Sequence, residues 1–259
     1  YKRQVSGSYG KSVEVFDFVQ PHEFLQKCLR ADFVLGAPGV SSVERTKLGI
    51  PQLLFSVADN QLRLGESLGE LDVAVYGGDL RTLAPADIKA RIIKYITEPL
   101  LTFDASLGRL MFDFHGPARM LQALAPAEEV SCSIRLANLS DGPTLFLWAN
   151  DPTRRLNSLE SGPILPKDHS AWLEKWLGEG SSCSIFVFLC DQVPAGQIKF
   201  HPTEILGEFE VGYSLDKVFR GQGLARKLLE MGIRQHLEST AARRYSATVK
   251  ATNLSLIHI

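Results

Sequence analysis

The feature that constrains this chain most is a glycine-bearing turn between an expected strand and an expected helix. Residues 220–225 read R-G-Q-G-L-A and fit the pattern R-x-x-G-x-A. The strand-like run 209–215 precedes the turn, and a helix-like run with Leu224, Leu228 and Ile233 on one face follows it. Such a turn leaves several backbone N–H groups pointing into one concavity, at the positive end of the helix dipole. The turn therefore predicts a pyrophosphate site, in which glycine is required because a Cβ would block the phosphate oxygens.

The elements around this turn resemble the acetyl-CoA-binding core of the GNAT N-acetyltransferases. Glu210-Val211-Gly212-Tyr213 lies on the preceding strand, and an expected strand over 245–249 leads to Asn253. An ordinary glycine turn before a helix is the alternative, which this order of elements disfavours. The resemblance implies acetyl-CoA as the cofactor, with these residues binding it: Val211, Tyr213, Arg220, Gly221, Gln222, Gly223, Leu224, Ala225 and Asn253.

Acetylation of an amine requires a neutral amine, a polarised thioester and a route for the amine proton. In this fold catalysis is largely positioning, and a backbone N–H near 211–213 would polarise the thioester carbonyl. Glu210, or alternatively Glu208, is the candidate catalytic base. Taken singly, each is more readily explained as a solvated or ion-paired carboxylate. The family usually continues with N-x-x-S and a tyrosine that protonates the leaving thiolate, whereas here Ser255 falls one place early and no tyrosine follows.

The start of the second half carries a further likeness. A W-x-N-D-P motif and a later His-x-x-Trp helix resemble a GNAT branch that acetylates amino groups of sugars and of protein N-termini; the residues are Trp148, Asn150, Asp151, Pro152, His169 and Trp172. Aromatic residues at helical spacing mostly fill cores, so we expect packing roles for Trp148, Trp172 and Trp176. Lining of an acceptor pocket is the alternative.

The first half alternates expected strands and helices. Apolar strand-like runs cover 13–19, 31–36, 53–57 and 73–75, with helix-like runs between them. This alternation predicts a parallel α/β sheet, whose ligands lie at the carboxyl ends of the strands.

That half resembles the nucleotide-binding C-terminal lobe of GT-B glycosyltransferases, and most of all the UDP-2,4-diacetamido-2,4,6-trideoxy-β-L-altropyranose hydrolases of pseudaminic acid biosynthesis. The matching residues are the run AD-x-V-x-G at 31–36, Gly39, Ser41, Ser42, Glu44, Gly49, Pro51, Ala58, Asn60 and Gln61. The resemblance implies substrate-binding roles, with Gly39, Ser41 and Ser42 at the diphosphate, Glu44 at the ribose, and Asn60 and Gln61 near the phosphate or sugar. For Ser41 and Glu44 a capping box is the alternative. A looser likeness covers 113–119. The family's catalytic histidine lies in an N-terminal lobe that this sequence does not contain, so hydrolysis is expected only of a complete parent.

A length of 259 residues predicts two domains. The Ala-Pro-Ala-Glu-Glu segment at 125–129 sets the expected boundary, giving a GT-B-like lobe over 1–126 and a GNAT domain over 127–259 that is incomplete at its C-terminus. The chain begins with Tyr1 and ends at Ile259 directly after a strand, so we expect a fragment at both ends.

Composition excludes several classes of protein. The net charge of −1 disfavours a nucleic-acid-binding surface. Four scattered cysteines without C-x-x-C spacing predict reduced thiols and no metal site. No apolar run reaches the ~18 residues of a membrane span, and no signal peptide is recognisable. We therefore expect a cytoplasmic protein with no membrane partner, whose oligomeric state the sequence leaves open.

Together these likenesses predict a bifunctional enzyme of pseudaminic, or nonulosonic, acid biosynthesis. One half would transfer an acetyl group to the 4-amino group of a UDP-amino-sugar, and the other would hydrolyse a UDP-sugar in the complete parent. One alternative is a GNAT enzyme acting on a protein or peptide amine, fused to a glycosyltransferase-like lobe. The other is a ligand-binding fragment without turnover.

Overall fold

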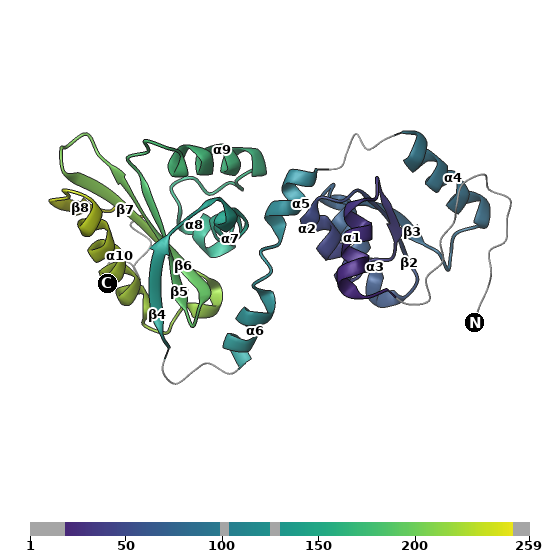
Figure 1. Ribbon diagram of the computed structural model, residues 1–259, viewed down its shortest axis with the longest axis horizontal. Helices are drawn as coiled ribbons and strands as arrows, with labels where there is room; N and C mark the ends of the chain where they lie inside the picture. The colour runs from purple at the N-terminus through teal and green to yellow at the C-terminus, as the bar shows by residue number, and fades with distance from the viewer. Residues whose placement is uncertain (1–18, 99–103, 125–129, 251–259) are drawn as a thin grey trace. The chain divides into compact units, whose positions relative to one another are not determined.

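The computed structural model describes residues 19–98, 104–124 and 130–250 of the chain. It divides into two compact units, Tyr1–Leu101 and Thr102–Ile259 (Figure 1). Each unit is built around its own sheet.

The first unit alternates helices and strands, as the sequence predicts. In chain order its elements are α1 (Pro21–Leu29), β1 (Val34–Gly36), α2 (Val40–Leu48), β2 (Gln52–Ser56), α3 (Asp59–Glu70), β3 (Val75–Asp79) and α4 (Pro85–Thr97). The sheet has the order β1-β2-β3, and both pairings are parallel. The central strand β2 is buried along its whole length, which explains its continuous apolar run. Most of the expected strand over 13–19 lies outside the described residues.

The third strand of this sheet is displaced from its prediction. We expected it over 73–75, but β3 begins at Val75 and continues through two glycines to Asp79. The backbone N–H groups of Val73 and Ala74 both donate to the Leu68 carbonyl and close the end of α3. Val73 and Ala74 are therefore apolar because they are buried beneath α3, and not because they belong to a strand.

The second unit is a mixed sheet with helices on both faces. Its elements are α5 (Ala105–Met111), α6 (Gly116–Leu124), β4 (Cys132–Leu136), η1 (Leu139–Asp141), α7 (Gly142–Ala149), α8 (Pro152–Asn157), α9 (Pro166–Leu177), β5 (Ser184–Cys190), β6 (Val193–Pro202), β7 (Glu208–Leu215), η2 (Lys217–Phe219), α10 (Leu224–Ser239) and β8 (Arg244–Ser246). The strand order is β4-β5-β6-β7-β8; the first three pairings are antiparallel, and β7 runs parallel to β8.

The two faces of this sheet carry separate cores. Helix α10 covers one face (Figure 1), where Phe200 stacks on His236 with ring centroids 4.2 Å apart. A Cβ on Gly232 would lie 2.6 Å from Ile198, so this glycine lets α10 approach the sheet closely. On the other face Leu145 and Trp148 of α7 pack with Leu173 of α9.

The units divide between Leu101 and Thr102, well before the boundary expected after residue 126. Helices α5 and α6 belong to the second unit because an ion-pair network ties them to it. Arg119 of α6 contacts Asp113 and also Asp216, which follows β7. Thr144 of α7 donates a hydrogen bond to Asp113 over 3.0 Å. The proline and alanines of 125–129 suggested a linker, but composition does not reveal these long-range pairs.

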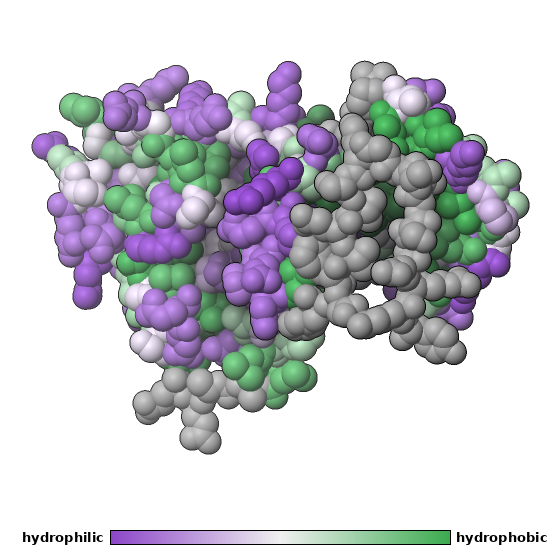
Figure 2. All heavy atoms as spheres, turned by 45° about the vertical axis from the view of Figure 1, so that its right-hand side comes forward, coloured by the Kyte–Doolittle hydropathy of each residue, from purple (hydrophilic) through white to green (hydrophobic). Residues whose placement is uncertain are grey.

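Hydrophobic side chains on the face shown in Figure 2 are interspersed with hydrophilic ones. Among the described residues, none of the helices combines the length and the hydrophobicity that crossing a membrane requires.

Candidate functional site

Strands β7 and β8 form a fork. They pair only through Glu208, Phe209 and Glu210. On its other side β7 pairs with β6 from Phe209 to Leu215. From residue 211 onward, the free side of β7 faces no strand in the described part of the chain, which leaves backbone groups open to an extended ligand.

The outer arm of the fork is shorter than predicted. We expected a strand over 245–249, but β8 ends at Ser246. The chain beyond it turns away from β7, and Lys250 donates from Nζ to the Leu156 carbonyl of α8 over 2.9 Å. Divergence from β7 removes the pairing that would have continued the strand. Asn253, which is predicted to bind the cofactor, lies outside the described residues.

The glycine turn lies next to this fork, between η2 and α10. Gly221 and Gly223 adopt positive φ values of 76° and 73°, which glycine reaches without strain. A Cβ built on either glycine would meet no atom within 4 Å, so the space beside the turn is open. Gly223 is the N-cap of α10, and no side chain caps the first N–H groups of the helix. These features fit the pyrophosphate of an acyl-CoA.

The polar side chains of the glycine turn hold its backbone in place through hydrogen bonds and an ion pair. Arg220 donates from Nε to the Leu215 carbonyl over 3.0 Å, and its Nη2 lies 2.8 Å from Oδ1 of Asp151. Gln222 donates to the Val218 carbonyl over 2.8 Å. Leu224 is buried in the core beneath α10. The predicted cofactor residues of the turn therefore offer backbone N–H groups, while Arg220 and Gln222 fix its shape.

The W-x-N-D-P motif supports the same turn. Trp148 donates from Nε1 to Asp216 over 2.8 Å, and Asp216 in turn accepts from the Val218 N–H and caps η2. Asp151 caps α8 and binds Arg220; its pKa is lowered against the effect of burial by bonds from the Arg154 N–H and from Arg220. Asn150 exchanges two hydrogen bonds with Ile164. Through Trp148 and Asp151 the motif thus helps to hold the glycine turn in place.

The predicted residues of β7 divide between the two faces of the sheet. Val211 and Tyr213 lie opposite Phe200 and Ile198 in the register with β6, and so on the α10 face. Glu210 lies opposite His201, on the face that α9 covers.

The two candidate bases differ in their surroundings. Glu210 pairs with Ser246, the last residue of β8, and therefore lies where the fork opens. Its Oε2 is 3.2 Å from Nε2 of His201, and its side chain is 35% exposed. Glu208 lies before the fork, with its side chain 12% exposed and its Oε2 3.6 Å from Arg244. Glu210 therefore has the geometry of a base at the fork, and Glu208 that of an ion-paired structural carboxylate.

Sequence reasoning missed one cation, Lys199, on the same face of the sheet as Glu210. Lys199 of β6 lies opposite Gly212, and its Nζ is 5.7 Å from the ring centroid of Trp172 and 5.3 Å from that of Trp176. Burial, together with the charge of Arg154, lowers the pKa of Lys199 to about 8. A charged residue at an inward position of β6 was the only signal of this site in the sequence.

The predicted nucleotide residues of the first unit lie around the start of α2 and α3. Gly39 is the N-cap of α2, and the Ser42 hydroxyl accepts from its N–H and donates to its carbonyl, over 2.9 and 2.7 Å. This capping exchange uses Gly39 and Ser42, not Ser41 and Glu44. Ser42 is fully buried, whereas Ser41 and Glu44 are exposed.

The remaining two predicted residues lie in the first turn of α3. Asn60 is exposed there. Gln61 accepts a hydrogen bond from the Val57 N–H over 2.8 Å, so its side-chain oxygen is engaged with the backbone.

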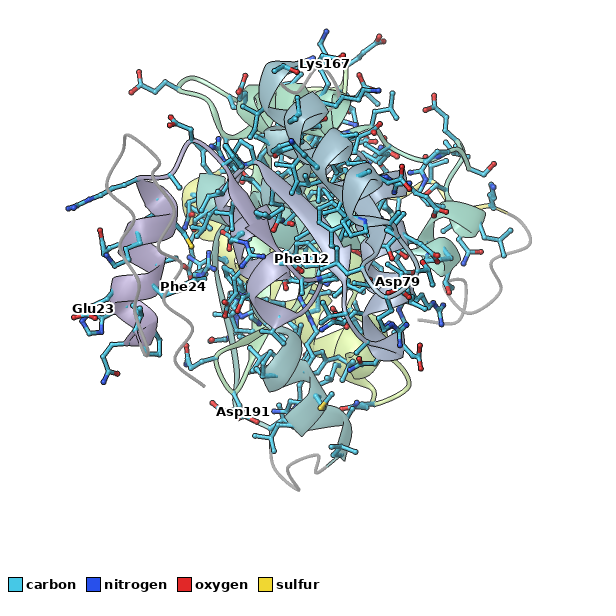
Figure 3. All side chains as sticks on the ribbon, turned by 90° about the vertical axis from the view of Figure 1, so that its right-hand side faces the viewer. Glu23, Phe24, Asp79, Phe112, Lys167 and Asp191 are labelled. Atoms are coloured by element: carbon cyan, nitrogen blue, oxygen red, sulfur yellow. The ribbon has the colours of Figure 1, made fainter. Side chains whose placement is uncertain are left out.

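A charged cluster lies at the carboxyl ends of the parallel strands. Asp79 (Figure 3) ends β3, and Arg81 bridges it to Asp59 at the start of α3, over 2.8 and 2.6 Å. Hydrogen bonds from Arg81 lower the pKa of Asp79. This cluster occupies the edge where ligands of such sheets bind, and it was not among the predicted residues.

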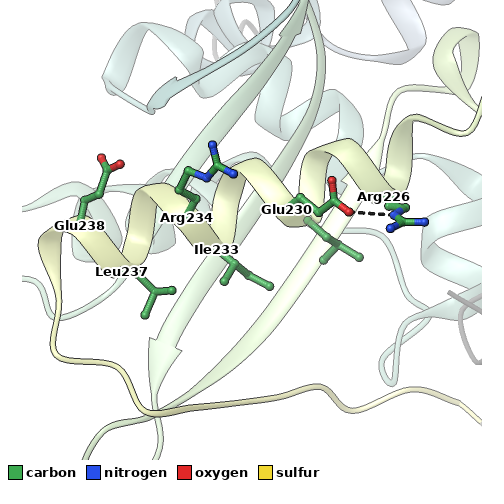
Figure 4. Close-up of a pocket in the computed structure, with 7 residues that line it drawn as sticks. Arg226, Glu230, Ile233, Arg234, Leu237 and Glu238 are labelled. Atoms are coloured by element: carbon green, nitrogen blue, oxygen red, sulfur yellow. Dashed lines mark hydrogen bonds and ion pairs between the residues drawn. The ribbon is translucent and has the colours of Figure 1, made fainter.

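A shallow hollow runs along the outer side of α10 (Figure 4). Apolar Leu229, Ile233 and Leu237 line it together with charged residues, among them the paired Arg226 and Glu230. Because Glu210 and Lys199 lie on the opposite face of the sheet, the hollow is not part of their site.

The forked sheet and the glycine turn at a helix N-terminus have a geometry that fits an extended, phosphate-bearing ligand. Residues 133–259 match the sequence model of the acetyltransferase (GNAT) domain. Over these residues the second unit is therefore similar to the GNAT acetyltransferases, and the predicted cofactor, acetyl-CoA, agrees with this match. No curated protein matches the chain.

Several solved structures resemble the second half of the chain. One is the ribosomal L7/L12 α-N-protein acetyltransferase RimL in complex with coenzyme A, at 18% identity and a TM-score of 0.44, covering 50% of this chain and 80% of that one. Another is the aminoglycoside acetyltransferase AAC(6')-Ib in complex with coenzyme A, at 18% identity and a TM-score of 0.43, covering 49% of this chain and 80% of that one. A third is the spermidine N-acetyltransferase of Vibrio cholerae with CoA and spermine, at 15% and 0.45, covering 49% and 76%. Because their TM-scores are below 0.5, these structures do not indicate which substrate this chain would use.

Proposed function

We propose that the second unit transfers the acetyl group of acetyl-CoA to an amine at the fork of β7 and β8. The observation that supports this most is the fork itself, where β7 loses its partner strand beside an uncapped helix N-terminus and two glycines with open space around them. An extended cofactor arm would lie along β7, and its pyrophosphate would lie at the turn.

The residues of the chain have distinct tasks in this reaction. The N–H groups at the start of α10 would hold the pyrophosphate, and the free edge of β7 near Val211 and Tyr213 would hold the arm. Acetyl-CoA supplies an activated acyl group as a thioester. The amine nitrogen bonds to the acetyl carbon as the C–S bond breaks, Glu210 accepts the amine proton, and the departing thiolate takes a proton from water. His201, 3.2 Å from Glu210, orients the carboxylate.

The substrate assignment is more specific than the family match. The amine would be the 4-amino group of a UDP-amino-sugar in pseudaminic acid biosynthesis, and the complete parent would also hydrolyse a UDP-sugar through its first unit. This part of the proposal is supported by the parallel sheet, by Gly39 at the N-terminus of α2, and by the sequence likeness around them.

Calorimetric titration with acetyl-CoA tests the proposed function. We expect saturable binding, and its loss in Gly223→Asp, which places a carboxylate in the anion site. Gly180→Asp is the matched control, because Gly180 also has a positive φ, of 79°, with no atom within 4 Å of an added Cβ. It should bind acetyl-CoA as the unchanged chain does. Absent binding, or equal binding by Gly223→Asp, would overturn the proposal.

Acceptor specificity is tested separately with acetyl-CoA held in excess. Acetylation of a UDP-amino-sugar, but not of a peptide N-terminus, supports the sugar assignment. The reverse preference would assign the unit to protein acetylation. Acetyl-CoA binding without transfer to either would favour a binding fragment.

A further inference from the structure

The face of the sheet that carries Glu210 also carries several cations. Lys199 comes from β6, Arg154 and Arg155 come from α8, and Lys250 reaches α8 from beyond β8. The charges of Lys199, Arg154 and Arg155 lie close enough to disfavour one another. These residues come from separate parts of the chain, so the fold brings the charges together.

Lys199 is held across the strand that forms the fork. A Cβ on Gly212, its partner on β7, would lie 2.8 Å from Lys199 Cε, so the side chain passes directly over this glycine. The ammonium group lies against Trp172 and Trp176, and Glu210 is the carboxylate whose charge acts on it. Glu210 is itself paired with His201. Lys199 thus places a positive charge beside the candidate base.

Arg154 is the more unusual of the cations. Its guanidinium is deeply buried, and within the described part of the chain its Nη1 atom has no hydrogen-bond partner. The carboxylate whose charge acts on it is Asp151, which already binds Arg220 and caps α8. A buried guanidinium without a dedicated partner costs stability. Its position is explained if an anion completes its hydrogen bonds.

We propose that Arg154 and Lys199 form an anion subsite for the acceptor, so that the amine acetylated at the fork belongs to a molecule carrying a phosphate or carboxylate group. The planar guanidinium of Arg154 suits bidentate binding of either group. Lys199 adds a second positive charge from the sheet, and Trp172 and Trp176 line the subsite beside Lys199. The inference rests on the proposed acetyl transfer but not on the sugar assignment, because it applies to any amine that carries one of these anionic groups.

The test compares matched amines on the full chain with CoA bound at saturation, so that no turnover occurs. Glucosamine, glucosamine 1-phosphate and muramic acid present the same amine with no anion, a phosphate and a carboxylate. We expect at least one anionic amine to bind about tenfold more tightly than glucosamine, as a charge-assisted bond predicts. The stronger of the two identifies the anion. Calorimetry measures affinity, and quenching of tryptophan fluorescence reports binding beside Trp172 and Trp176.

Variants assign the effect to the subsite. Arg154→Gln and, separately, Lys199→Met should abolish the preference for the anionic amine while CoA affinity is unchanged. Arg234→Gln, an exposed arginine on α10, should leave the preference intact. Thermal unfolding shows which variants fold. If Arg154→Gln does not fold, Lys199→Met alone tests the subsite.

Three results would overturn the inference while CoA still binds: equal affinity for the three amines, tighter binding of the polycation spermine, or a preference that survives both substitutions. Failure of CoA to bind would instead contradict the proposed acetyl transfer itself. The two ideas therefore fail by different measurements.

Discussion

At the scale of single residues, the buried charge of Lys199 in the candidate site lowers the stability of the fold. Its pKa in the folded chain, about 8, lies below the ordinary value of 10.5, chiefly because burial disfavours the charged form. At neutral pH the protonated lysine is therefore less stable in the folded chain than in the unfolded chain, which is a cost to the free energy of unfolding. That cost is fully present below pH 8 and disappears as the pH rises from about 8 towards 10.5, since the folded form releases its proton first.

Lys199→Met should consequently stabilise the chain while removing the anion subsite. After discounting for solvent screening, we expect the free energy of unfolding at pH 7 to rise by about 1–2 kcal/mol. Methionine retains much of the aliphatic contact with Trp172 and Trp176. Urea denaturation at pH 7 and pH 10 measures the difference, which should shrink at the higher pH. A variant less stable than the unchanged chain at pH 7 would show that the ammonium group contributes to folding.

At the scale of elements, helix α6 is held to the second unit by one charged side chain. Arg119 is 13% exposed and lies between two carboxylates, Asp113 at 6% and Asp216 at 8% exposure. Burial opposes the charge of Arg119, but the pairs with Asp113 and Asp216 raise its pKa. Removing the cation leaves both carboxylates buried without their partner.

Arg119→Met should therefore destabilise the second unit by about 3 kcal/mol, the cost typical of breaking a buried ion pair. Gln122→Met is a suitable control in the same helix, because Gln122 makes an exposed hydrogen bond of 3.2 Å to Asp191. We expect that control to change stability by less than about 0.5 kcal/mol. Chemical denaturation of the two variants checks the contrast, and equal losses would mean that α6 docks through its apolar contacts.

Elements with strong local signals could be predicted from the sequence. Helix α7 begins at Gly142, directly before Pro143, and ends at Ala149, shortly before Pro152, and prolines in such positions mark helix boundaries in a sequence. The glycine turn was located from the pattern R-x-x-G-x-A between a strand-like and a helix-like run, and both of its glycines adopt positive φ in the structure. Strand β3 was displaced because Val73 is apolar for a different reason, its burial beneath α3.

The acceptor side of the site could not be predicted in the same way. Lys199 and Arg154 lie far apart in the sequence, and each resembles an ordinary surface cation there. Their relation depends on the register that sets Lys199 against Gly212, and on the placement of α8. Arg119 and Asp216 likewise meet only through the tertiary fold. Contacts of this kind carry no periodic signal, so no sequence pattern indicates that α6 packs with the second unit.

At the scale of the whole molecule, the boundary between the units has consequences for the glycine turn. Asp216 accepts from the Val218 N–H and so caps η2, which leads into the glycine turn. The same carboxylate binds Arg119 and Trp148. Helix α6 therefore supports the turn through one shared carboxylate, although it precedes the residues that match the acetyltransferase domain.

Shortened chains test this dependence directly. A chain of residues 104–259 retains α5 and α6, whereas one of residues 127–259 begins after them and leaves Asp216 without Arg119. We expect the shorter chain to unfold at a lower temperature, by roughly 10 °C for a loss of about 3 kcal/mol. It should also bind acetyl-CoA more weakly, because the cap of η2 loses its fixed position. Arg119→Met in the longer chain should reproduce part of both effects. Equal melting temperatures and equal acetyl-CoA affinities for the two chains would show that α5 and α6 do not support the turn, as expected if they belonged to the lobe predicted over 1–126.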